Sequence, residues 1–167
     1  LMPLDIDALS WARTNNCLLT VVDQHDSPRM VIEFFSGFED AIDVIEAWNS
    51  MLVGIPSYRL DMLEKLRSNY NVYLLSNTNA LHLEWIHRYV RKVHHVDSFE
   101  KQYFDHAFYS HLVGDRKPNA SLFKFIIEDA YMTPALTLYM DDVQENLDVA
   151  GKLGFETYLV KPGEEIA

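Results

Sequence analysis

The stretch LYMDDVQENLDVAGKLGFETYLV, residues 138–160, decides the fold of this chain. A short apolar run ends in Asp141 and Asp142, a helical pattern follows over VQENLDVAGKL, and ETYLV is a second apolar run. Gly154 fits the left-handed position that closes a helix. Strand, helix and strand joined by short loops predict parallel strands with a right-handed crossover.

The same alternation extends towards the N-terminus as far as residue 57. NVYLLS is a continuous apolar run typical of a strand that is buried on both faces, and HAFYS is a weaker strand. Helical patterns occupy YRLDMLEKLRSNY, ALHLEWIHRYVRKV and NASLFKFIIEDAY, the last with Pro118 and Asn119 suited to its start. We therefore predict that residues 57–167 form an α/β domain, a Rossmann-like parallel sheet with helices on both faces.

Residues 4–56 have a helical hydrophobic pattern without the alternating strands, and we predict that they form a small N-terminal helical unit. In FEDAIDVIEAWNSML, residues Ile42, Ile45, Trp48 and Leu52 recur at helical spacing with acidic residues opposite. VIEFFSGF, residues 31–38, is an apolar patch interrupted at a helix junction. Its aromatic residues and Trp48 are expected in the core of this unit, where one of them could also contact a substrate.

The composition of the chain excludes some classes of function. With 167 residues, 49% of them hydrophobic, the chain is long enough to bury a core, and no apolar run approaches the roughly 20 residues of a membrane span. A formal net charge of −11 argues against a nucleic-acid partner. The lone Cys17 fits a reducing compartment, and no signal-peptide pattern opens the chain. We expect a cytoplasmic protein whose oligomeric state the sequence leaves open.

Polar residues stand where the predicted strands end, the edge at which parallel sheets bind ligands. They are Ser76 and Asn77 after VYLL, Lys117 in GDRKPNASLF, and Asp141 with Asp142. Separately, each has a structural explanation as a helix cap, a turn residue or a solvated lysine. Together they favour metal-assisted phosphoryl transfer, because Mg²⁺ relieves paired carboxylates and a hydroxyl with a lysine stabilises phosphoryl oxygens.

VYLLSNTN, GDRKPNASLF and LYMDDVQENLDVAGKLGFETYLV resemble the second, third and fourth motifs of the haloacid dehalogenase-like (HAD) hydrolase superfamily. The motifs are most similar to those of the subfamily with a small helical cap, which includes sugar-phosphate phosphatases. The resemblance implies that Ser76, Asn77 and Lys117 form the phosphate site and that Asp141 and Asp142 bind Mg²⁺. It also implies a small phosphorylated metabolite as substrate, an aspartyl-phosphate intermediate and residues 4–56 as the cap.

The family's first motif, which carries the nucleophilic aspartate, has no good match. Asp5 and Asp7 are the early candidates, yet too few residues precede them for a central strand, and Pro3 cannot donate to a sheet ladder. We therefore expect the nucleophile on a central strand upstream of Leu1. Asp5 and Asp7 as that motif, and a relative without a nucleophile, remain the alternatives.

Other functions account less well for the polar residues at the predicted strand ends. A two-component receiver domain also gathers acidic residues, a hydroxyl and a lysine, but its acidic pair follows the first strand rather than a late one. A catalytically inactive, ligand- or protein-binding HAD-like domain is an alternative. A metal-independent haloacid dehalogenase is another, although it leaves the Asp141–Asp142 pair unexplained. The histidines lack the spacing of a zinc motif.

Overall fold

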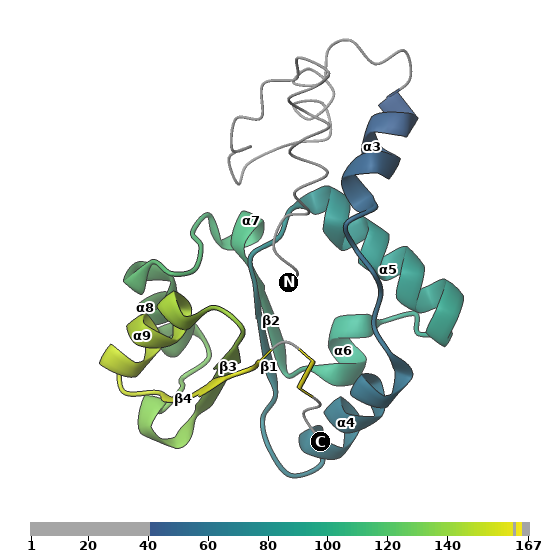
Figure 1. The fold of residues 1–167 in the computed structure, drawn as a ribbon. Helices are drawn as coiled ribbons and strands as arrows, with labels where there is room; N and C mark the ends of the chain where they lie inside the picture. Colours follow the sequence, from purple (N-terminus) through teal and green to yellow (C-terminus); the bar gives the residue numbers. More distant parts are fainter. Residues whose placement is uncertain (1–40, 162, 165–167) are drawn as a thin grey trace.

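The computed structural model describes residues 41–161, 163 and 164. Helices and parallel strands alternate along them, and the three-layer arrangement is visible in Figure 1. The elements are α3 (Ala41–Asn49), α4 (Ser57–Arg67), β1 (Tyr73–Ser76), α5 (Ala80–His94), α6 (Phe99–Tyr103), β2 (His106–Tyr109), α7 (Ser110–Val113), α8 (Ala120–Asp129), η1 (Pro134–Leu136), β3 (Leu138–Asp141), α9 (Gln144–Lys152) and β4 (Glu156–Leu159).

Strand β1 lies between two layers of helices, as its continuous apolar sequence predicts. Leu74 packs against a buried apolar cluster formed by residues of α4, α5 and α6. Tyr73 and Leu75 pack against a second apolar cluster, which includes residues of α8 and α9. Successive side chains of a strand point to opposite faces, which accounts for this alternation. The predicted α/β fold with helices on both faces is confirmed.

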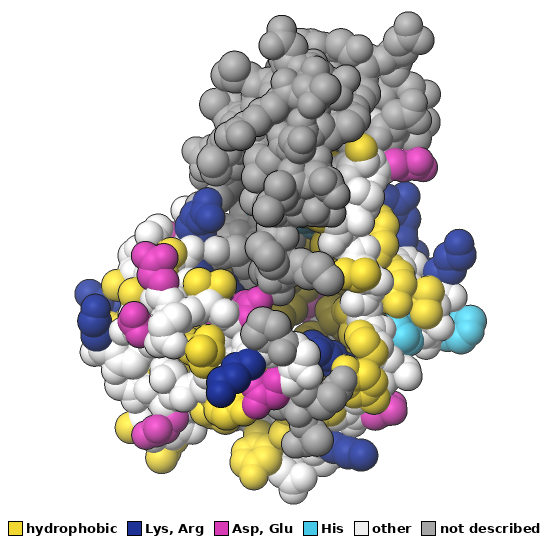
Figure 2. Space-filling model, viewed as in Figure 1, with side chains coloured by type: hydrophobic (Ala, Val, Ile, Leu, Met, Phe, Trp, Pro, Cys, Tyr) yellow, Lys and Arg dark blue, Asp and Glu magenta, His cyan; other side chains and the backbone are white. Residues whose placement is uncertain are grey.

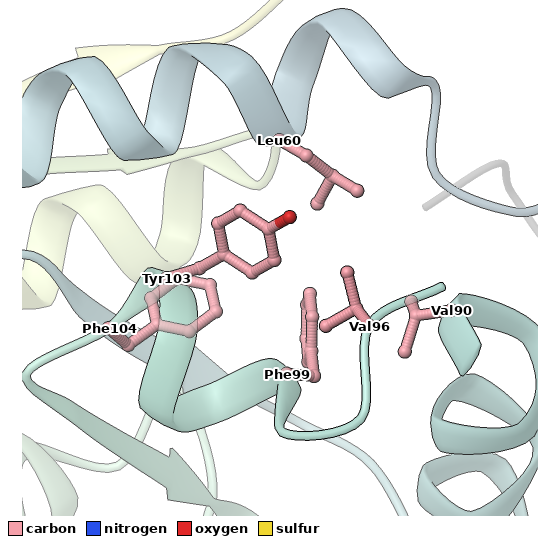
Figure 3. Packing of buried hydrophobic residues seen from close by; sticks show 6 residues of the cluster. All are labelled: Leu60, Val90, Val96, Phe99, Tyr103 and Phe104. Atoms are coloured by element: carbon pink, nitrogen blue, oxygen red, sulfur yellow. The ribbon is translucent and has the colours of Figure 1, made fainter. Parts of the chain in front are cut away.

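The two clusters form most of the described core. The first joins α4, α5 and α6 through the six residues labelled in Figure 3: Leu60, Val90, Val96, Phe99, Tyr103 and Phe104. The second joins β2, α8 and α9 through Phe108, Leu122, Phe123, Ile126, Ala150 and Phe155. Both clusters are rich in aromatic rings, several in edge-on contact.

The strands do not form one continuous sheet among the described residues. β1 pairs in parallel with β2, with Ser76 opposite Tyr109, and β3 pairs in parallel with β4, with Asp141 opposite Leu159. β1 and β3 are not paired with each other, and within residues 41–161 each has a strand partner on one edge only. Leu138 and Met140, which share one face of β3, are 59% and 37% exposed.

Three short elements were not foreseen from the sequence: α6, α7 and η1 have five, four and three residues. Segments of one turn or little more are too short to show a helical period. The expected junction at residues 31–38, including Ser36 and Gly37, lies outside the described residues, as does Cys17.

The described surface mixes charges of both signs. On the face in Figure 2, basic side chains are scattered among acidic and apolar ones rather than gathered into one patch. None of the helices within residues 41–161 has the length and apolar content needed to cross a membrane.

Candidate active site at the carboxyl ends of β1 and β3

Asp141, the last residue of β3, is the centre of a buried hydrogen-bond network. Its Oδ1 accepts from the Val143 N–H and from Asn146 Nδ2, both at 2.9 Å. Its Oδ2 accepts from Lys117 Nζ at 2.7 Å and from the Tyr139 hydroxyl. These four donors match the roughly four lone-pair sites of a carboxylate.

The network keeps Asp141 ionised. Burial of its carboxyl group acts to raise the pKa, but hydrogen bonds from Lys117, Tyr139 and Asn146, with the charge of Lys117, outweigh burial and lower the pKa. Burial, followed by the hydrogen bond to Asp141, raises the pKa of Tyr139. Tyr139 is therefore a neutral donor to a charged acceptor.

Lys117 links the ends of β1 and β3, although these strands are not paired. Its Nζ binds Asp141, while its backbone N–H donates to Asn77 Oδ1 at 2.9 Å. Asn77 Nδ2 donates in turn to the Lys117 carbonyl at 3.0 Å. The Asn77 side chain thus fixes the loop that carries Lys117, and three of the predicted site residues are brought together.

The loop after β1 is held from the neighbouring strand. The Ser110 hydroxyl, directly after β2, accepts from the Thr78 N–H and donates to the Thr78 carbonyl, both at 3.0 Å. Asn79 Oδ1 accepts from the His82 N–H and caps α5. Ser76, at the end of β1, is half-buried, and its hydroxyl makes no hydrogen bond to a described residue.

The donor set suits a hard divalent cation. Asp142 follows Asp141 directly and is exposed, whereas Asp141 is buried. Mg²⁺ commonly takes one or two carboxylates and completes its octahedron with phosphate oxygens and water. Among the described residues no group of three or more His, Cys, Asp or Glu side chains could hold a metal ion.

Two site residues were missed by sequence reasoning. Tyr139 precedes Asp141 by two residues on one strand, so the period of a strand could have placed both side chains on one face. Ser110 could have been found by applying the strand-end rule to β2 as well as to β1 and β3. The candidate nucleophiles Asp5 and Asp7 lie outside the described residues.

Comparison with known proteins gives a consistent result, although no family model matches the chain. D-ribitol-5-phosphate phosphatase from Bacteroides thetaiotaomicron is 32% identical over 120 residues, 72% of this chain and 57% of that protein. The match thus spans less than two thirds of this curated relative.

Solved structures extend the likeness to most of the chain. A HAD family enzyme from Bacteroides thetaiotaomicron, in an aspartate-to-alanine mutant with magnesium and inorganic phosphate, superposes with a TM-score of 0.80 at 32% identity. The superposition covers 97% of this chain and 86% of that one. A HAD-like family hydrolase from Porphyromonas gingivalis has a TM-score of 0.78 and 26% identity, with 96% and 82% covered. The chain therefore belongs to the haloacid dehalogenase-like hydrolase superfamily.

Proposed function

We propose that the protein is a Mg²⁺-dependent phosphatase that hydrolyses a small phosphorylated metabolite through an aspartyl-phosphate intermediate. The observation that carries the proposal is the buried Lys117–Asp141 ion pair, which joins the loop before α8 to the acidic end of β3. The relative named as a D-ribitol-5-phosphate phosphatase favours a sugar or polyol phosphate as substrate.

In the proposed phosphate site, two side chains bind the phosphoryl oxygens directly and a third holds one of them in place. Lys117 donates one of its three ammonium protons to Asp141, so the others are available for phosphoryl oxygens. The Ser76 hydroxyl, which has no hydrogen bond to a described residue, is the second donor. Both ends of the Asn77 amide are engaged by the Lys117 backbone, so Asn77 supports the site by holding Lys117 in place.

The proposed Mg²⁺ ligands are Asp142 directly and Asp141 through water. Each Asp141 oxygen already accepts two hydrogen bonds, which leaves water as the link to a metal ion. Asp142, the next residue, is exposed to solvent. Bound Mg²⁺ would neutralise charge that develops on the transferring phosphoryl group. Tyr139 and Asn146 would hold Asp141 in one orientation during turnover.

The proposed nucleophile is an aspartate on a strand outside the described residues that fits between β1 and β3. The edges of β1 and β3 that have no strand partner among the described residues support this position. The carboxylate would attack phosphorus, the bond from phosphorus to the ester oxygen would break, and the leaving alkoxide would take a proton. Water would then cleave the acyl phosphate. Residues 4–56, which include α3, would form the cap over the site.

The test is phosphate release by the full-length protein from a panel of sugar and polyol phosphates. We expect turnover with Mg²⁺, none with EDTA, and a loss of at least 100-fold in Asp141→Asn. Asp148→Asn, on the exposed part of α9, is the matched control and should keep wild-type activity. Absence of phosphate release from every ester would favour an inactive binding domain, and halide release without metal would favour a dehalogenase.

A further inference from the structure

Asn119 departs from the usual role of its residue type at the start of a helix. Asparagine is among the favoured N-cap residues, and Asn119 occupies the N-cap position of α8, yet its side chain makes no capping hydrogen bond. Its Nδ2 donates instead to Asp115 Oδ1 at 2.7 Å. Departures from a local rule concentrate at sites that function constrains, so this contact needs an explanation.

Asp115 accepts hydrogen bonds from residues on both sides of Lys117 in the sequence. Its Oδ1 also accepts from the Arg116 N–H at 2.8 Å, and its Oδ2 accepts from the Ser121 hydroxyl at 2.5 Å. The second distance lies in the range of a charge-assisted O–H···O⁻ hydrogen bond. The hydrogen bonds from Ser121 and Asn119 lower the pKa of Asp115, so its carboxyl group is ionised at neutral pH and can only accept.

These hydrogen bonds close the loop of residues 115–121 onto the first turn of α8. The helix is itself fixed in the core, because Leu122 and Phe123 are both 0% exposed and belong to the cluster that joins β2, α8 and α9. Lys117 therefore lies in a loop that Asp115 ties to a rigid element.

We propose that Asp115 is a positioning residue, whose carboxylate holds the loop so that the Lys117 ammonium group is kept at Asp141; its effect on turnover rests on the proposed function. Asn77 holds the Lys117 backbone from the end of β1 through two hydrogen bonds. Asp115 holds the same loop from the start of α8. Because a lysine side chain is flexible, fixing the backbone at its base reduces the freedom that the ammonium group must lose to occupy one position.

The first experiment measures kcat/KM of the full-length, Mg²⁺-loaded protein with the sugar or polyol phosphate that it hydrolyses fastest. Asp115→Ala removes the three hydrogen bonds, and kcat/KM should fall about tenfold or more because Lys117 is displaced from the phosphoryl oxygens. Asp115→Asn keeps an oxygen for the two N–H donors, and its amide group can donate to the Ser121 hydroxyl, so it should keep most of the activity. Asp129→Ala, at the exposed far end of α8, is the matched control and should match the wild type.

The second experiment follows Lys117 itself by NMR and needs no turnover. The two Hε protons of a lysine held in one conformation have different chemical shifts, whereas those of a freely rotating side chain coincide. The Lys117 Cε–Hε signal is the one that is absent from Lys117→Met. We expect two proton shifts in the wild type, in Asp115→Asn and in Asp129→Ala. In Asp115→Ala their difference should shrink or vanish, at a temperature at which circular dichroism shows every variant to be folded.

The two readouts separate failure of this inference from failure of the proposed function. An unchanged Lys117 signal in Asp115→Ala would overturn the inference whatever happens to activity, because Asp115 would then not hold Lys117. A collapsed signal with unchanged kcat/KM would overturn its effect on turnover, and equal losses in Asp115→Asn and Asp115→Ala would overturn a role through hydrogen bonding. If the wild type hydrolysed no ester while the signal collapsed in Asp115→Ala, the proposed function would fail and the positioning of Lys117 by Asp115 would stand.

Discussion

Lys117 Nζ lies 2.7 Å from Asp141 Oδ2, and the two side chains are only 11% and 4% exposed. One comes from the loop before α8 and the other from the end of β3, so the pair fixes two elements that are 24 residues apart in sequence. An ion pair in this setting depends on both partners, because either charge alone would be buried without compensation.

Replacing Lys117 by Met should therefore destabilise the protein by about 3–5 kcal/mol, the range found when one partner of a buried pair is removed. Urea unfolding measures the change. The double variant Lys117→Met/Asp141→Leu should be clearly more stable than the sum of the single effects predicts. Strict additivity of the two single losses would contradict energetic coupling between these residues.

Asp142→Asn should weaken Mg²⁺ binding about tenfold or more, since it removes the charge of the proposed direct ligand. Isothermal titration of the full-length protein with MgCl₂ measures this directly, independently of turnover. Asp148→Asn serves as control and should bind like the wild type. If Asp141→Asn lost Mg²⁺ while Asp142→Asn kept it, the assignment of the two aspartates would have to be exchanged.

Ser110→Ala should lower both stability and activity, although Ser110 is proposed to contact neither phosphate nor metal. Its hydroxyl is the partner of the Thr78 N–H and carbonyl, and Ser110 itself is buried. Leaving such groups unpaired costs about 1–3 kcal/mol and should displace the loop that carries Ser76 and Asn77. Urea unfolding and kcat/KM should fall together, whereas Ser68→Ala at the exposed end of α4 should change neither.

Glu100→Gln should lower the Tm at pH 7 and have less effect in acid. Burial acts to raise the pKa of Glu100, but hydrogen bonds from Tyr109 and His87 outweigh it and lower the pKa. The stabilisation is therefore present above the ordinary glutamate value of roughly 4.3 and is lost as the pH falls through the lowered value. Thermal unfolding at pH 7 and pH 3 measures it.

Glu128→Gln, on the exposed face of α8, is the control for this pH dependence. An equal Tm difference between Glu100→Gln and the wild type at both pH values would show that the charge of Glu100 does not contribute. The Tyr109 hydroxyl donates to Glu100 Oε1 at 2.6 Å, and a glutamine oxygen can still accept it. The variant therefore removes the charge of Glu100 while keeping an acceptor for the Tyr109 hydroxyl.

The sequence by itself determined the alternation of helices and strands from residue 57 onward, the strand ends that carry Ser76, Asn77 and Asp141, and the loop before a helix that carries Lys117. These features are local, because continuous apolar runs, helical periods and capping residues are set by near neighbours in the chain. The three motifs in order also identified the superfamily. Short elements such as α6 and α7 were missed because so few residues show no period.

Only the tertiary structure decided which groups meet. It brought Lys117 to Asp141, engaged the Asn77 amide on the Lys117 backbone, and placed Tyr139 and Ser110 in the site. Among the described residues it also divided the strands into two separate ladders, β1 with β2 and β3 with β4. These are contacts between distant segments, fixed by packing and hydrogen bonding in three dimensions, which spacing along a chain does not encode.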